Sequence, residues 1–179
     1  NNAVGYKNNF GMASLWITYS PDETDVGDSN GVTDGQGDDG QYTAALKVSQ
    51  DNWEAFVSMV DNGNSDATAE YDSTKVGGQY NMGPHTISAQ YEMSSQGTGA
   101  NTDTDTMFLG YQMKMGKNTF VAQIGQTDED GVSEKEDYMA IGAIHKLNKK
   151  ARVFVGYRDT DQGAVSEESS FSVGLRVDI

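Results

Sequence analysis

A two-residue alternation of apolar and polar side chains recurs along this whole sequence, and it constrains the fold more than any other feature. Successive side chains of a β-strand point to opposite faces of a sheet, so the alternation indicates strands with one apolar and one polar face. No segment holds a convincing period of 3.6 residues, the repeat of an amphipathic helix. The alternation predicts eleven strands, at 2–7, 10–19, 41–49, 53–60, 73–81, 85–94, 104–114, 119–127, 136–147, 151–159 and 169–179.

The lengths of these strands and of their connections indicate a membrane protein. Most strands are close to the roughly 9–11 residues that a tilted strand needs to cross a bilayer. The connections alternate strictly between short and long, as in outer-membrane barrels, which have short periplasmic turns and longer extracellular loops. The short turns, predicted on the periplasmic side, are Asn8-Asn9, Gln50 to Asn52, Met82 to Pro84, Met115 to Asn118 and Asn148 to Lys150. The long loops, predicted outside, lie near 20–40, 61–72, 95–103, 128–135 and 160–168.

The apolar rows are the predicted lipid-facing rows. A soluble β-sandwich also has an apolar face, which forms its core, so alternation alone leaves both folds open. Aromatic side chains end many of the apolar rows, and this favours the membrane because aromatic girdles mark the two interfaces of a bilayer. These aromatic residues are Tyr19, Tyr42, Trp53, Tyr80, Tyr91, Phe120, Tyr157 and Phe171. The predicted lipid contacts are Leu15, Ile17, Leu46, Val48, Ile87, Leu109, Ile124, Val153 and Leu175.

The polar rows carry charged side chains in mid-strand or near the turns, where a watery lumen would accommodate them. The candidate pore-lining residues are Lys47, Glu54, Lys75, Glu92, Lys114, Arg152, Arg158 and Arg176. Four glutamines, Gln79, Gln90, Gln112 and Gln123, are expected on the same face. The sequence shows no track of aromatic residues along the polar rows, so binding of a specific sugar is a minority interpretation.

Composition excludes several classes of function. The chain has 179 residues and a formal net charge of −15, and such a polyanion repels nucleic-acid phosphates. It has no Cys, and its longest apolar runs are a few residues long, so neither a disulfide framework nor a membrane helix is expected. Gly-x-Ser-x-Gly, P-loop and His-Glu-x-x-His motifs are absent. We therefore expect no enzyme, no catalytic residues, no cofactor and no metal. His85 and His145 are interpreted as interfacial residues of the apolar rows.

Charge is distributed unevenly between the two ends of the predicted strands. Of the 27 acidic residues, 23 lie in or beside the long loops, and seven of these are in 20–40. Most basic residues lie at or near the short turns instead. An acidic outer rim would attract cations, and divalent cations bound there could bridge to lipopolysaccharide phosphates.

Three segments resemble Gram-negative general porins. Residues 171–179 are similar to the terminal strand that the barrel-assembly machinery recognises, although porins usually end in Phe and this sequence ends in Ile179. Residues 138–157 are similar to the two strands, with their Asn-Lys turn, that precede the last porin loop. Residues 2–19 resemble the strand pair that follows the porin constriction loop.

The resemblance implies an all-β fold, a transmembrane antiparallel β-barrel of 16 strands of which eleven are visible. Residues 1–179 would then form the carboxy-terminal part of a single barrel domain, with the amino-terminal strands and the constriction loop preceding Asn1. The implied function is a water-filled channel of the cell outer membrane for passive diffusion of ions and small hydrophilic solutes. The implied partners are outer-membrane lipid, lipopolysaccharide and two further copies in a homotrimer. The visible charges predict a weak preference for cations.

The alternative from another class is a secreted or surface-layer β-protein with acidic calcium-binding loops. Its support is the run Asp128-Glu129-Asp130-Gly131 with Asp137, which loosely resembles a calcium loop. Gln126 stands at the first ligand position, and strands instead of helices flank the run, so the spacing is a weak indication.

Overall fold

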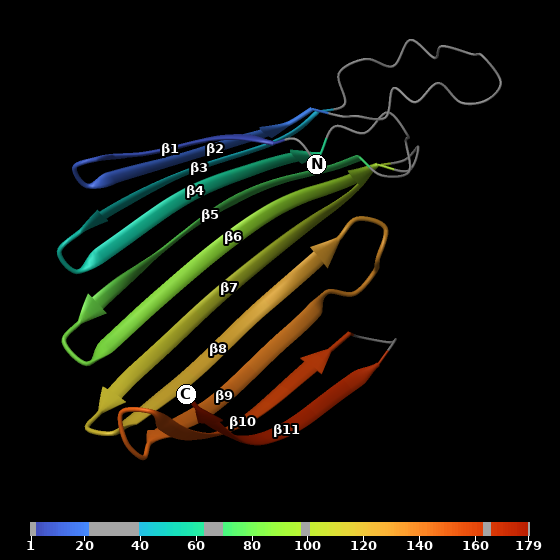
Figure 1. Cartoon of the computed structure of the whole chain (residues 1–179). Helices are drawn as coiled ribbons and strands as arrows, with labels where there is room; N and C mark the ends of the chain where they lie inside the picture. Colours follow the sequence, from blue (N-terminus) through green and yellow to red (C-terminus); the bar gives the residue numbers. More distant parts are fainter. Residues whose placement is uncertain (1–2, 22–39, 63–69, 98–100, 163–165, 179) are drawn as a thin grey trace, which may run out of the picture.

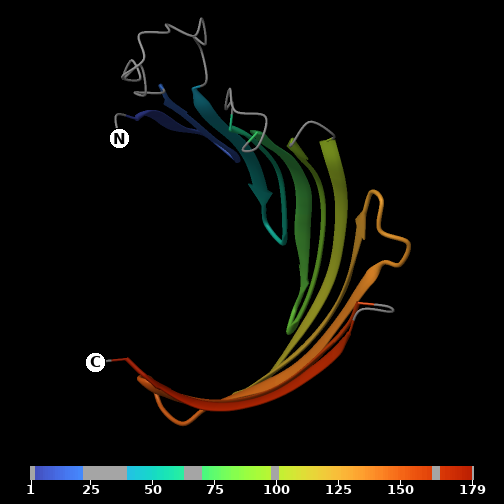
Figure 2. The ribbon, with the colours of Figure 1, turned by 90° about the vertical axis from the view of Figure 1, so that its right-hand side faces the viewer.

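The computed structural model describes residues 3–21, 40–62, 70–97, 101–162 and 166–178. These residues form one sheet of eleven strands in which each strand pairs antiparallel with its neighbours in sequence. The sheet curves into an arc that is open on one side (Figures 1 and 2). The predicted all-β, antiparallel fold is therefore confirmed. The strands are β1 (Val4–Phe10), β2 (Ala13–Ser20), β3 (Gln41–Gln50), β4 (Trp53–Asn62), β5 (Glu70–Met82), β6 (His85–Gly97), β7 (Asn101–Met115), β8 (Asn118–Glu129), β9 (Glu136–Lys146), β10 (Ala151–Asp161) and β11 (Glu167–Val177).

The predicted strands match these elements, with two corrections. The turn predicted at Asn8-Asn9 is wrong, because β1 continues to Phe10 and the chain reverses at Gly11 and Met12. Strands β4 to β8, β10 and β11 are also longer than predicted at their long-loop ends; β7 has 15 residues and begins at Asn101. Their added residues are polar but still pair with their neighbours, so part of the predicted loop sequence belongs to the sheet.

Four of the short turns share one backbone feature, a residue with positive φ at the first turn position. Gly11, Gly83 and Gly116 have φ near +60°, at 62°, 60° and 60°, and Asp51 has φ 46°. Each is the first of two turn residues, the position at which a type II′ hairpin turn requires positive φ and at which glycine is favoured. Such turns match the twist of the flanking strands, so they set the register of each hairpin.

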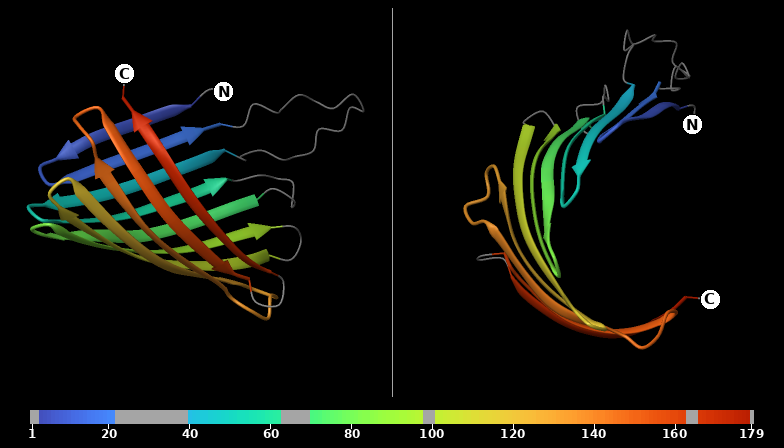
Figure 3. Two further views of the ribbon diagram at one scale, coloured as in Figure 1. Left: turned by 90° about the horizontal axis from the view of Figure 1, so that it is seen from below. Right: turned by 90° about the vertical axis from the view of Figure 1, so that its left-hand side faces the viewer.

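The short turns gather at one end of the sheet, and the strand ends that the longer connections join lie at the other (Figures 1 and 3). Of the five predicted long loops, the one near 128–135 is described; β8 ends there at Glu129 and β9 begins at Glu136. The rest fall wholly or partly on 22–39, 63–69, 98–100 and 163–165, which lie outside the described residues. Strands β1 and β11 form the two edges of the sheet, and in the described structure each pairs with one neighbour. No helix in the described part of the chain is long and apolar enough to cross a membrane.

The two faces of the sheet differ in exposure and in chemistry. The sheet is curved, so it has one convex and one concave face (Figure 2). Side chains diverge on the convex face of a curved sheet and converge on its concave face, so the more exposed row belongs to the convex face. On β4, Val57 and Met59 are 38% and 56% exposed, whereas Phe56 and Ser58, which alternate with them, are half-buried. The apolar rows therefore form the convex face and the polar rows the concave face. Among the described residues no apolar side chain is buried, so the sheet has no hydrophobic core of its own.

Candidate functional site

The concave face brings together the charged residues that the sequence analysis selected. Strand register places all eight predicted pore-lining residues on this face, spread over β3, β4, β5, β6, β7, β10 and β11. These side chains form several separate contacts instead of one cluster, as expected for residues that line the wall of a wide channel. The structure therefore locates these residues together on one surface, and their contact with water in a pore remains a prediction.

Two lysine–glutamate pairs join neighbouring strands on the concave face, one beside the β3–β4 turn and one in the middle of β5 and β6. Lys47 Nζ lies 2.9 Å from Glu54 Oε2, which also accepts a hydrogen bond of 3.1 Å from the Ser49 hydroxyl. Lys75 and Glu92 stand directly opposite each other, and Lys75 Nζ is 2.8 Å from Glu92 Oε2. The second carboxylate is held from its other side, where the buried Ser73 hydroxyl donates a 2.8 Å hydrogen bond to Oε1. These pairs neutralise two of the wall's lysines.

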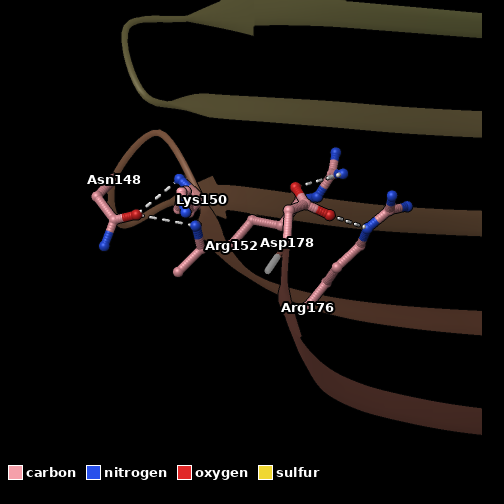
Figure 4. Close-up of polar contacts among 6 residues, drawn as sticks. Asn148, Lys150, Arg152, Arg176 and Asp178 are labelled. Carbon is pink, nitrogen blue, oxygen red and sulfur yellow. Dashed lines mark hydrogen bonds and ion pairs between the residues drawn. The ribbon is translucent and has the colours of Figure 1, made fainter.

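The remaining predicted residues of the face are cations with fewer partners. Arg152 and Arg176 share one carboxylate, that of Asp178, at Nη2–Oδ2 3.7 Å and Nε–Oδ1 2.9 Å (Figure 4). Arg158 lies 5.5 Å above the ring of Tyr138. Within the described residues Lys114 forms no ion pair. The wall of β7 to β11 is therefore more basic than the wall of β3 to β6.

Neutral polar side chains fill the space between the charges. Gln79, Gln112 and Gln123 line a hollow of about 290 Å³ on the concave face, together with Ser88 and Lys114. Gln123 also accepts a 3.0 Å hydrogen bond from the hydroxyl of Tyr138. Gln90 lies on the same face, on β6, which pairs with the strand of Gln79. All four predicted glutamines are therefore on the face to which the alternation assigned them.

Six aromatic side chains also lie on the concave face, contrary to the absence of an aromatic track inferred from the sequence. They are Trp16, Phe56, Tyr71, Phe108, Tyr138 and Phe154. Their positions in the polar rows could have indicated this. Several rings lie over glycines: a Cβ on Gly77 would be 2.8 Å from the ring of Phe56, and one on Gly174 would overlap the ring of Phe154. These rings therefore cover bare backbone, which gives them a structural role in the sheet.

The convex face presents apolar side chains bounded by aromatic ones. All nine predicted lipid contacts and all eight predicted girdle residues lie on this face. At the long-loop end, Tyr19 and Tyr42 stack with ring centroids 6.1 Å apart. At the short-turn end, His85 stacks on Tyr111 at 5.9 Å and its Nδ1 lies 2.7 Å from the tyrosine hydroxyl. The second predicted interfacial histidine, His145, lies at the same end. Its Nδ1 is 2.7 Å from Oδ1 of Asn118, the residue at which β8 begins after a short turn.

The acidic segment proposed as a calcium loop is occupied by pairings within the protein. The carboxylate of Asp128 lies 2.8 Å from Lys135 Nζ, and this hydrogen bond and charge raise the pKa of the Lys135 ammonium group above its ordinary value. Asp137 accepts a 2.8 Å hydrogen bond from Gln126. In the described ranges, no three His, Cys, Asp or Glu side chains are grouped so that they could hold a metal ion. The alternative of a calcium-binding β-protein thus gains no support from this geometry.

Comparison with solved structures identifies the same architecture. An anion-selective porin from Comamonas acidovorans is 17% identical with a TM-score of 0.79, covering 99% of this chain and 59% of that one. OmpF of Salmonella typhi in complex with daunomycin is 15% identical with a TM-score of 0.74, covering 97% and 61%. The trimer form of OmpT, an outer membrane protein of Vibrio cholerae, is 15% identical with a TM-score of 0.67, covering 99% and 64%. The chain thus spans about three fifths of the length of these proteins.

Comparison with sequences gives the family. No curated protein matches the chain significantly. The family model for Gram-negative porins matches residues 1–164 of the 179. Porins are channels without catalytic activity, which agrees with the expectation that this chain is not an enzyme. Since the match covers nearly the whole chain and the fold agrees with it, the chain belongs to the family of Gram-negative porins of the outer membrane.

Proposed function

We propose that this chain forms part of the wall of a water-filled channel through which ions and small hydrophilic solutes diffuse passively. The observation that carries the proposal is the inverted distribution of side chains over the curved sheet. A soluble sheet would bury its apolar face, whereas here the apolar face is convex and exposed and the polar face is concave. A bilayer outside and water inside is the environment that satisfies both faces.

The convex face is the proposed lipid contact. The stacked pairs Tyr19–Tyr42 and His85–Tyr111 stand at opposite ends of the strands, where aromatic rings favour the two membrane interfaces. We assign the long-loop end to the outside, where its acidic residues would meet lipopolysaccharide, and the short-turn end to the periplasm. By analogy with the trimer form of OmpT, the assembled protein is proposed to be a homotrimer.

The concave face is the proposed conducting surface, and its charges support a weak preference for cations. The wall is basic, but Lys47 and Lys75 are each neutralised by a glutamate within 3 Å, which weakens its attraction for anions. The 23 acidic residues assigned to the outer mouth would concentrate cations there, because a low-dielectric wall focuses the field. Salt near 0.15 M screens this field beyond about 8 Å, so the preference should be largest at low ionic strength.

The test is the reversal potential of single channels of the full-length protein in a KCl gradient, measured at low and at high ionic strength. We expect a weak cation preference that declines as salt is raised. An anion preference that persists at low salt would contradict the cation proposal and would assign control to the basic wall. Absence of any conductance in correctly assembled protein would contradict the channel itself.

A further inference from the structure

Three cations stand side by side on the concave face at the short-turn end. Arg152 on β10 is directly opposite Lys146 on β9 and directly opposite Arg176 on β11. The β9–β10 turn adds Lys149 and Lys150 next to this row. We call these five residues the basic turn cluster.

The basic turn cluster is electrostatically unfavourable for the sheet that holds it. Like charges directly opposite each other on neighbouring strands destabilise a sheet. One acid, Asp178, faces the cluster, and its carboxylate is shared by Arg152 and Arg176. Among the described residues, Lys146, Lys149 and Lys150 form no ion pair. Within the described residues, five cations thus accompany a single carboxylate, a surplus that a bound anion would compensate.

The backbone around the cluster is held in a defined shape. Asn148 Oδ1 accepts hydrogen bonds from the amides of Lys150 and Ala151, at 2.8 and 2.9 Å (Figure 4). The amide of Asp178 donates a 2.8 Å hydrogen bond to the Lys150 carbonyl, which ties the end of the chain to the turn. The turn borders an open hollow of about 200 Å³, lined by Lys146, Asn148, Lys149, Lys150, Arg152 and Asp178. Four of the five cations, all except Arg176, therefore border a preformed space several water molecules in size.

We propose that the basic turn cluster is a binding site for a soluble phosphate-bearing anion at the periplasmic mouth of the channel. The location at a mouth rests on the proposed function; the site itself rests on the register of Lys146, Arg152 and Arg176. Guanidinium groups match phosphate oxygens in bidentate geometry, and lysines add point charge, so a divalent phosphate group suits this mixture best. The row lies on the concave face, away from the apolar convex surface, which favours an anion in water over a lipid headgroup.

Binding of inorganic phosphate to the full-length protein in neutral detergent, measured by calorimetry against a constant chloride background, tests the site. Arg152→Gln should weaken binding by about tenfold or more, because it removes charge-assisted hydrogen bonds. Asp178→Asn should tighten binding, since it removes the carboxylate that competes for both arginines. Lys135→Gln, in the β8–β9 loop at the opposite end, is the matched loss of one cation and should leave the affinity unchanged.

Thermal unfolding separates a binding role from a structural one. Arg152→Gln relieves repulsion, so without phosphate its melting temperature should equal or exceed that of the wild type, while stabilisation by phosphate should be lost. A lower melting temperature with undiminished phosphate affinity would overturn the proposal. So would equal affinity in the wild type and Arg152→Gln, or an effect seen only with vesicles containing phosphatidylglycerol and not with free phosphate. Conductance in phosphate-free KCl is independent of all these outcomes, so failure of this site leaves the channel proposal standing.

Discussion

Leu109→Arg is the substitution that most sharply tests the assignment of the convex face to lipid. Leu109 lies near the middle of β7 and is 46% exposed, between Ala89 on β6 and Ile124 on β8. A mid-strand position on a tilted spanning strand is close to the bilayer midplane, where arginine facing lipid costs about 2–4 kcal/mol. This corresponds to a loss of about 30- to 900-fold in the folding equilibrium within the membrane.

The control for this substitution is Gln112→Arg on the same strand. Gln112 lies on the concave face beside Thr86 and Val121, so its arginine would enter water and should fold at almost no cost. The assay is the fraction of full-length protein that assembles into lipid vesicles as heat-modifiable, protease-resistant material over a urea series. We expect a lowered urea midpoint for Leu109→Arg and a wild-type midpoint for Gln112→Arg. The reverse order would show that the two faces have been assigned the wrong way round.

Three further perturbations test other parts of the structure. Gly77→Ala should destabilise the folded protein by about 1–3 kcal/mol, because the new Cβ would lie 2.8 Å from the Phe56 ring and 2.9 Å from the Ala89 carbonyl oxygen; Gly156→Ala, with its nearest atom at 3.4 Å, is the control in thermal unfolding. Lys75→Met should lower stability more than the Lys75→Met/Glu92→Gln double variant, since the single change leaves the Glu92 carboxylate without the ammonium group that lies 2.8 Å away. A double-mutant cycle that shows no coupling energy would contradict a stabilising role for this pair. Protease added to intact cells should cut in the loop between Glu129 and Glu136 and spare Asn148 to Lys150; cleavage only at the latter would invert the topology.

The existence of the strands and the side to which each residue points could be predicted from the sequence because both depend on local alternation. Leu46 and Lys47 fall on opposite faces from their adjacency alone, and the structure agrees. The first turn could not be placed in this way, because the polar Asn8 and Asn9 resemble turn residues. The positive φ of Gly11 decides where the chain reverses.

Pairings between side chains depend on register, which alternation does not give. Lys75 and Glu92 are opposite because they are equally distant from the Gly83-Pro84 turn, so this contact was accessible once the turn type was known. The pairing of Arg152 with Arg176 depends on the connection between β10 and β11, whose length and shape no local rule specifies. The concave aromatic residues could have been found from the alternation, since they stand in the polar rows. That Phe56 and Phe154 cover glycines on the neighbouring strand is recognised only after the strands are paired.

Cysteine accessibility along β6 tests most directly the claim that water lies on the concave face and lipid on the convex one. The chain has no Cys, so a single introduced thiol reports one position in it. Cysteines would replace Ile87, Ser88, Ala89, Gln90, Tyr91 and Glu92 one at a time in the full-length protein, reconstituted in vesicles. A charged, water-soluble thiol reagent should label positions 88, 90 and 92 rapidly and positions 87, 89 and 91 slowly. Equal labelling of both sets, or faster labelling of the odd-numbered set, would contradict the account.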